Sequence, residues 1–420
     1  MPAIDIDEGL TPDQIQLRKE AHRFAAEVMR PAASELDDRP PDEVIATESR
    51  LWDVFRQAYA AGYHLRGFPA DLGGAAMSPG DSWVVGEEFG WGNAGLSISL
   101  GVTSMPFRFA AMTGHPDLMR DVVMPYVEDT EGKYVGCWCA TEPDHGSDLI
   151  LFSGDNTRPD IHFDCGARRD GDDWVINGQK SAWVSNGTIA THALAFLSVD
   201  PSAGMAGTGV AIVPLNLPGI TRGKPLNKLG QRALNQGEIF FDNVRIPRHY
   251  MLAEPGVMSG GTDNILAGAN AGMSTTFCGV ARAAFEEALF YAQQRVQGGV
   301  PIAEHQLVQR RLFDMFSKLE AARSLSKLAN RRLTSGQPTL HYSIAAKVFC
   351  TQTAFDIADD AVQLFGGIGL AKGTPAEMLF RDARASLIED GSNDVLALLG
   401  FRSLRAAATP DAVPNATPTA

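Results

Sequence analysis

The stretch Cys139-Ala-Thr-Glu-Pro-Asp-His-Gly-Ser-Asp148 carries most of the information about the fold of this chain. It leaves a run of residues typical of a β-strand and enters a loop crowded with hydroxyls, carboxylates and a glycine. An acidic surface loop is the simplest alternative for this composition. The sequence on either side of the stretch therefore has to distinguish a surface loop from a binding loop.

The stretch lies at the start of a segment with β-type patterning. Between about residues 135 and 247, short runs rich in Val, Ile, Phe and Trp are separated by Gly, Asp, Asn and Pro; examples are HALAFLSV, TGVAIVPL and GEIFFDNVRI. We assign residues 135–250 to a middle β-domain, a small barrel or sandwich.

Both flanks have helical patterning. Thr11 precedes Pro12, which predicts an N-cap and a first helical residue at the start of an N-terminal helical domain, residues 1–134. From Ala281 onward, apolar residues recur at helical spacing, with further stripes over 307–328 and 344–365, which predicts a C-terminal four-helix bundle over 251–406. The fold class is thus mainly α with a central β-domain. We expect the proline-rich tail, residues 407–420, to be disordered.

Composition narrows the range of partners. The 420 residues carry a formal net charge of −14, which opposes binding to nucleic acid or to anionic membranes, because both require clustered Lys and Arg. A small, enclosed substrate fits better. No basic-then-apolar leader and no run of 18 apolar residues is present, so we expect a cytoplasmic protein that does not cross a membrane.

The five cysteines form an odd, scattered set that indicates reduced thiols rather than a disulfide framework. Cys137 and Cys139 form a C-x-C pair, but no second Cys/His cluster at ligand spacing completes a site. We interpret the pair as two residues on the same face of a strand and predict no metal site.

The opening stretch, read as TEP-x-x-GSD, resembles the flavin signature of the acyl-CoA dehydrogenases. The resemblance implies that Thr141 hydrogen-bonds the pyrimidine edge of FAD and that Gly146 and Ser147 approach the pyrophosphate and the substrate. Small residues suit such a place because backbone N–H groups must come close to phosphate oxygens. Trp138 and Ala140 belong to the same implied cofactor-binding set. His145 stands where the family usually has a small residue, and we expect a solvated side chain there.

A second stretch, Trp174-Val-Ile-Asn-Gly-Gln-Lys180 followed by Trp183-Val-Ser185, resembles the part of the family's β-domain that covers the flavin ring. The resemblance implies that Trp183 covers the isoalloxazine and that Ser185 donates to flavin N5, where negative charge builds. The spacing before Trp183 is one residue longer than usual, so a core role for Trp183 is the alternative. Residues 149–173 have no counterpart that we can place, and we expect them near the mouth of the active site.

Two C-terminal stretches resemble parts of the family that reach the FAD of a neighbouring subunit. One is Tyr291-Ala-Gln-Gln-Arg295 with Gln306 after it, and the other is Gln363-Leu-Phe-Gly-Gly-Ile-Gly369. The implied cofactor contacts are Arg295, Gln306, Gln363, Gly366 and Gly367. The glycines follow a helical run rather than a strand and lack G-x-G-x-x-G spacing, so they fit a Rossmann site poorly. A cofactor shared between subunits implies an obligate homo-oligomer, which in this family is a tetramer.

The catalytic position departs from the family pattern. Where most members carry a Tyr-Glu-Gly sequence, this chain has Glu389-Asp390-Gly391, and the register makes Asp390 the base that removes the α-proton. A slip of one residue would make Glu389 the base instead. In the same segment, Gly391 is implied to contact the substrate and Ser392 and Asp394 to contact the cofactor. The family's substrate-side arginine corresponds to Asn270, which leaves the usual acyl-CoA contact in doubt.

The resemblance implies an FAD-dependent acyl-CoA dehydrogenase that introduces an α,β double bond into an acyl thioester of coenzyme A or of a carrier protein. Its electron acceptor would be an electron-transferring flavoprotein. An aspartate base also resembles the nitroalkane oxidases of the same superfamily, although their arginine seven positions after the base is Ala397 here. Two further alternatives are a superfamily member that binds DNA, which the acidic charge opposes, and one that has lost catalysis, which the carboxylate at position 390 opposes.

Overall fold

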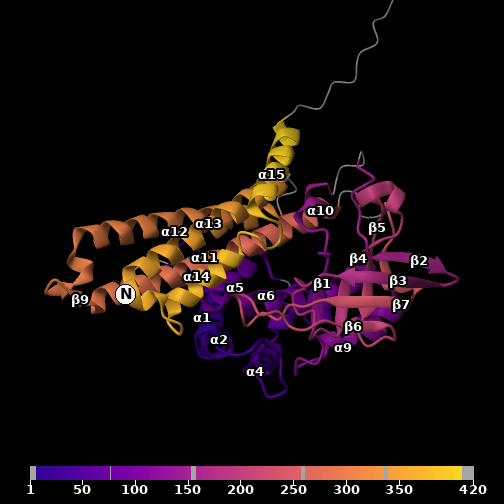
Figure 1. Cartoon of the computed structure of the whole chain (residues 1–420), viewed down its shortest axis with the longest axis horizontal. Helices are drawn as coiled ribbons and strands as arrows, with labels where there is room; N and C mark the ends of the chain where they lie inside the picture. The colour runs from indigo at the N-terminus through magenta and orange to yellow at the C-terminus, as the bar shows by residue number, and fades with distance from the viewer. Residues whose placement is uncertain (1–5, 76, 153–157, 257–260, 335–338, 409–420) are drawn as a thin grey trace, which may run out of the picture.

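The computed structural model describes residues 6–75, 77–152, 158–256, 261–334 and 339–408. Figure 1 shows a long helical bundle from the C-terminal part of the chain, with the N-terminal helices and a β-sheet packed along one side of it. The predicted order of helices, then a β-domain, then helices is confirmed.

The N-terminal part begins as its sequence predicts. The Thr11 hydroxyl accepts the backbone N–H of Gln14 at 3.2 Å, and the Gln14 side chain accepts the Thr11 N–H in return, which completes a capping box before Pro12. The helices that follow are α1 (Pro12–Phe24), α2 (Arg30–Asp37), α3 (Pro41–Val44), α4 (Arg50–Ala60), α5 (Pro79–Gly92), α6 (Ala94–Thr103), α7 (Met105–Thr113), α8 (Pro116–Leu118) and α9 (Met124–Val127).

The middle part forms one sheet of eight strands among the described residues. The strands are β1 (Gly136–Cys139), β2 (Gly166–Asp170), β3 (Asp173–Lys180), β4 (His192–Ser198), β5 (Thr208–Pro214), β6 (Ile220–Arg222), β7 (Ile239–Pro247) and β8 (Met251–Ala253). Their order is β6-β7-β3-β2-β4-β5-β8, and β1 pairs in parallel with β4. The short helix α10 (Ser147–Leu151) lies between β1 and β2 in the sequence. Because β8 pairs with β5, the sheet continues just past residue 250.

The C-terminal bundle is built from α11 (Gly261–Gln294), α12 (Gln306–Arg332), α13 (Leu340–Phe365), α14 (Pro375–Ala385) and α15 (Asn393–Ala408). A short hairpin, β9 (Val296–Gln297) and β10 (Val300–Pro301), joins α11 to the start of α12. The alanine-rich stripe of α11 is buried as predicted, since small side chains let α11 pack closely on α13 and α5. Ala407 and Ala408 belong to α15, and the rest of the predicted disordered tail lies outside the described residues.

All five cysteines are free thiols, as predicted, and the structure buries all of them. Cys137 and Cys139 lie on the same face of β1, with their Sγ atoms 3.6 Å apart. Within the described residues, no helix has both the length and the apolar character needed to cross a membrane.

Candidate flavin and substrate site

A buried ion pair holds the loop that follows β1. The Lys180 ammonium, at the end of β3, lies 2.6 Å from the Glu142 carboxylate, and both side chains are fully buried. The same carboxylate accepts the backbone N–H groups of Asp164 (2.6 Å) and Cys165 (3.0 Å). Lys180 also donates to the Ala140 carbonyl. The charge pair is therefore well hydrogen-bonded, which such a buried pair requires, and it fixes the loop between β1 and α10.

The two predicted flavin-facing stretches lie side by side. The backbone N–H of Ser181 donates to the Thr141 carbonyl at 2.8 Å, which places the Trp183-to-Ser185 turn next to the loop after β1. The turn is pinned by Asn186, whose buried side chain donates to the Ser99 and Gly136 carbonyls. Its backbone is left-handed (φ 63°), a conformation that Asn tolerates better than most residues.

The Trp183 side chain is 58% exposed, so it is not part of the core, which was the alternative role for it. An indole left uncovered beside a polar turn is a suitable surface for a flat ring. Trp138, by contrast, packs its ring against Phe196 and Phe109, with 4.7 Å and 6.1 Å between ring centroids.

The loop's second half reaches the C-terminal bundle. The Ser147 hydroxyl accepts the backbone N–H of Ser392 at 2.9 Å, a contact between residues 245 positions apart in the sequence. Gly146 has no atom within 4 Å of where a Cβ would stand, so there is open space beside its backbone. The Gly-Ser pair therefore contacts the turn that carries the predicted base.

The turn that carries the predicted base has an unusual backbone. Asp390 (φ 52°) and Gly391 (φ 97°) are consecutive left-handed residues, and a Cβ on Gly391 would stand 3.1 Å from the Ile150 and Leu396 side chains. Only glycine suits that second position. The ammonium of Lys347, fully buried on α13, donates to the Gly391 carbonyl and to Asn393 Oδ1, both at 2.8 Å, and so fixes the turn.

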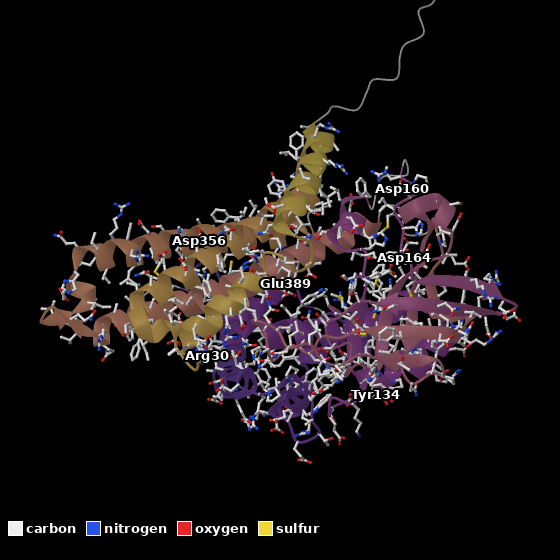
Figure 2. All side chains as sticks on the ribbon, viewed as in Figure 1. Arg30, Tyr134, Asp160, Asp164, Asp356 and Glu389 are labelled. Atoms are coloured by element: carbon white, nitrogen blue, oxygen red, sulfur yellow. The ribbon has the colours of Figure 1, made fainter. Side chains whose placement is uncertain are left out.

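The two adjacent carboxylates have different surroundings. Glu389 accepts a hydrogen bond from the Gln231 amide, and burial raises its pKa to about 7. Asp390 is an exposed residue whose carboxylate has no hydrogen bond or ion pair to any described residue. Crowding by protein atoms raises the pKa of Asp390, and the positive charge of Lys347 lowers it in part. Figure 2 shows Glu389 on the bundle, near the middle of the molecule. Of the two, Asp390 has the free carboxylate.

Two further predicted positions differ from expectation or await a partner. His145 is half-buried rather than solvated: burial lowers its pKa, but the hydrogen bond to Asp148 (2.7 Å) and nearby carboxylates raise it overall. Asn270 is fully buried in α11, its amide donates to the Leu266 carbonyl, and its Oδ1 has no partner among the described residues.

Asp394 is exposed in the first turn of α15, where an acidic residue suits the helix dipole.

The predicted contacts to a neighbour's cofactor gather at the other end of the bundle. Figure 1 shows the β9 hairpin at the end of the bundle remote from the sheet. The predicted residues Arg295, Gln306, Gln363, Gly366 and Gly367 are all exposed. Gln363 lines a cavity of about 340 Å³ between the hairpin and the end of α13, together with Gly298, His305 and Arg311. Within one chain these residues lie far from Asp390.

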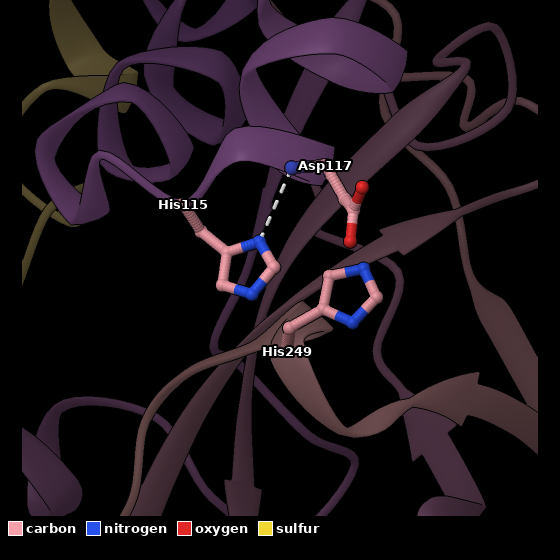
Figure 3. A group of neighbouring side chains, drawn as sticks. All are labelled: His115, Asp117 and His249. Carbon is pink, nitrogen blue, oxygen red and sulfur yellow. Dashed lines mark hydrogen bonds between the residues drawn. The ribbon is translucent and has the colours of Figure 1, made fainter.

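A group of metal-capable side chains lies away from both places. Ligand atoms of His115, Asp117 and His249 fall within 4.8 Å of one another, and the two imidazoles stack with centroids 4.6 Å apart (Figure 3). However, Asp117 pairs with Arg120 at 2.9 Å, and the His115 ring accepts the Asp117 backbone N–H at 3.3 Å. Because protein partners already use these groups, we assign them a structural role.

The residues of the loop after β1 and of the Trp183-to-Ser185 turn fit a bound flavin. Open space lies at Gly146, an uncovered indole at Trp183, and hydroxyls at Thr141 and Ser185. The helix–sheet–helix fold and this site together define a flavin-dependent oxidoreductase.

Comparison with known proteins gives the particular family. Three family profiles match in order: acyl-CoA dehydrogenase N-terminal domain (residues 11–126), middle domain (137–244) and C-terminal domain (243–404). Human mitochondrial short-chain specific acyl-CoA dehydrogenase is 31% identical over 332 residues, 79% of this chain and 77% of that protein. Benzylmalonyl-CoA dehydrogenase of Aromatoleum aromaticum is 29% identical over 94% of this chain and 98% of its own length. The structure of butyryl-CoA dehydrogenase from Megasphaera elsdenii superposes with a TM-score of 0.83, at 27% identity, over 95% of this chain and 100% of that one.

The chain belongs to the acyl-CoA dehydrogenase family, whose members are FAD-dependent oxidoreductases that act on CH–CH bonds. The sequence interpretation missed four residues that shape the site: Lys347, Gln231, Glu142 as an ion-pair partner, and Lys180. A lysine within an otherwise apolar helical stripe is a signal that could have indicated Lys347.

Proposed function

We propose that this chain dehydrogenates an acyl thioester, with Asp390 as the base that removes the α-proton. The observation that carries the proposal is the free carboxylate of Asp390, set beside the Gly146–Ser147 loop while its neighbour Glu389 is held by Gln231. A base in this position needs a carboxylate that no protein group has already engaged.

The chain's own groups would act as follows. Asp390 would accept the α-proton. Lys347 would hold the turn through the Gly391 carbonyl, and its positive charge would favour the ionised form of Asp390. The backbone N–H of Asp390 donates to no described residue, so it can donate to the thioester carbonyl and acidify the α-carbon. Ser147 holds the turn against the flavin-binding loop through Ser392.

Thr141, Gly146, Ser147, Trp183 and Ser185 would hold the flavin of the same subunit. Bound FAD would supply the acceptor for the β-hydride, so that loss of the α-proton to Asp390 and of the β-hydride leaves a trans-2-enoyl thioester. The uncovered Trp183 indole would exclude water from the ring face.

The experiment that tests this function is anaerobic mixing of the purified, FAD-loaded protein with single substrates while flavin absorption is followed. Suitable probes are butyryl-CoA, glutaryl-CoA and benzylmalonyl-CoA, because similar proteins carry those substrates in their names. Bleaching with at least one thioester supports the proposal. Bleaching with nitroethane and with no thioester contradicts it. We propose an electron-transferring flavoprotein as the natural acceptor, tested by reoxidation in its presence and in air.

A flavin oxidase of the nitroalkane oxidase type is the second candidate, favoured by the aspartate at position 390. It is weakened by Ala397, which is exposed on α15 and cannot supply the cation that would stabilise a nitronate. The nitroethane measurement above separates the two.

We also propose a homotetramer in which the hairpin end of one bundle completes the FAD site of another subunit. Two features of that end support it. The residues expected to contact a neighbour's FAD are exposed, and so are apolar side chains such as Phe290, Leu307 and Phe313. Such apolar side chains on a surface are typical of an interface.

We expect Arg295→Ala and Gln363→Ala to weaken both FAD retention and assembly, because both residues would contact a cofactor held by the neighbouring subunit. The measurement is FAD content and mass after gel filtration, with Arg56→Ala on α4 as the control for loss of an exposed charge. A variant that stays yellow and fully assembled would show that neither residue reaches a cofactor.

We expect Thr141→Val to keep the fold and slow flavin reduction by about ten- to a hundredfold, because it removes one donor to the ring without a cavity in the core. Stopped-flow reduction and the melting temperature of the holoprotein check this. An unchanged reduction rate would remove Thr141 from the site.

A further inference from the structure

One glutamine holds both residues that would face the flavin. Gln236, just before β7, donates through Nε2 to the Ser185 hydroxyl oxygen at 3.3 Å and to the Trp183 carbonyl at 3.2 Å. Ser185 and Gln236 also form an antiparallel β-bridge. The position of the Ser185 side chain therefore depends on Gln236.

The orientation of that amide is set by a lysine. Lys228 donates to Gln236 Oε1 at 2.8 Å and to the Leu234 carbonyl at 2.7 Å. An ammonium group only donates, so the side of the amide that faces Lys228 must be its oxygen, and the NH₂ must face Ser185. The Ser185 oxygen then accepts, and its single hydrogen points away from Gln236.

Lys228 has a charge environment that keeps it an ammonium near neutral pH. Burial lowers its pKa to about 8, Glu389 and Asp382 raise it, and Arg232 lowers it. Gln231 donates its side-chain amide to Glu389 and its backbone N–H to Asp382. Glu389, Asp382 and Gln231 therefore form one hydrogen-bonded network.

We propose that Lys228 and Gln236 are positioning residues that fix the direction of the Ser185 hydroxyl, so that it donates toward the flavin. The inference rests on the proposed function, in which Ser185 is the donor to N5. No described residue accepts the Ser185 hydrogen, which leaves it available. A donor at N5 would stabilise the negative charge that builds on the ring, whereas a reversed hydroxyl would present a lone pair instead.

Gln236→Glu is the sharpest test because it keeps the shape of the side chain and the contact with Lys228. A carboxylate only accepts, so Ser185 would turn its hydrogen toward Glu and away from the flavin. We expect flavin reduction by butyryl-CoA, or by whichever thioester probe bleaches the wild type, to slow by about ten- to a hundredfold. We expect the same loss in Ser185→Ala, which removes the donor itself. The dissociation constant of that probe should change little. Gln57→Glu, an exposed position on α4, is the control for the added charge.

A second readout does not depend on turnover. The absorption maximum of the oxidised flavin responds to hydrogen bonding at N5, so Gln236→Glu and Ser185→Ala should shift it in the same direction, and Gln57→Glu should not. The double variant Ser185→Ala with Gln236→Glu should be no slower than Ser185→Ala alone, because both changes remove the same bond. Lys228→Met, which frees the amide to rotate, should give a smaller loss.

The outcomes separate the two proposals. If Ser185→Ala is slow and spectrally shifted while Gln236→Glu behaves like the wild type, the positioning role is overturned and Ser185 remains the donor. If Ser185→Ala reduces at the wild-type rate, both the donor assignment and the positioning role are wrong.

Discussion

Replacement of Asp390 by Asn is expected to leave FAD bound and to slow substrate-dependent flavin reduction by about 10²- to 10⁴-fold, the usual contribution of a general base. Asn keeps the shape and hydrogen-bonding ability of Asp but cannot take a proton as a carboxylate. Glu389→Gln should have a much smaller effect, because Glu389 already accepts a hydrogen bond from Gln231 inside the protein. Stopped-flow reduction of the two variants, with FAD content measured in each, makes the comparison.

The same variants predict a pH profile. Asp390 must be ionised to accept the α-proton, and protein crowding raises its pKa, so the rate should rise with pH through that value. Asp390→Asn should lose this rising limb. Asp390→Glu should lower the rate if the pocket is built for the shorter side chain. An inactive Glu389→Gln with an active Asp390→Asn would mean that our register is wrong by one residue.

Local signals in the sequence were sufficient for the fold. The Thr11-Pro12 start, the β-type runs from 135 to 247 and the alanine stripe of α11 each reflect short-range rules of capping, alternation and helical periodicity. These rules apply to neighbouring residues in the sequence and do not depend on which distant segments pack against them. The TEP-x-x-GSD stretch added the family, since its residues lie within one loop.

Long-range pairings could not be predicted in this way. Ser147 meets Ser392 across 245 positions, and Lys347 reaches Gly391 from a different helix, because topology rather than local sequence brings them together. His145 illustrates the same limit: its loop composition predicted a solvated ring, but Asp148 and the neighbouring loop partly enclose it. The separate environments of Glu389 and Asp390 likewise depend on Gln231, about 160 residues earlier.

Replacement of Lys180 by Met is expected to lower both the stability of the protein and its retention of FAD. Lys180→Met removes the cation from a fully buried pair and leaves the Glu142 carboxylate with two backbone N–H donors but no counter-charge. Breaking such a pair on one side costs about 3–5 kcal/mol. Because Glu142 anchors the loop that carries Thr141, Gly146 and Ser147, FAD should be lost at a lower temperature as well.

The matched control is Lys133→Met, which removes a lysine from an exposed pair with Glu131, where the two groups are 2.5 Å apart. Solvent screening limits such pairs to about 0–1 kcal/mol, so its melting temperature should stay near that of the wild type. Lys180→Met with Glu142→Leu should recover part of the loss, since no unpaired buried charge remains. Thermal unfolding followed by flavin fluorescence measures protein melting and FAD release together. Equal melting temperatures for Lys180→Met and Lys133→Met would mean that the buried pair does not hold the flavin-binding loop.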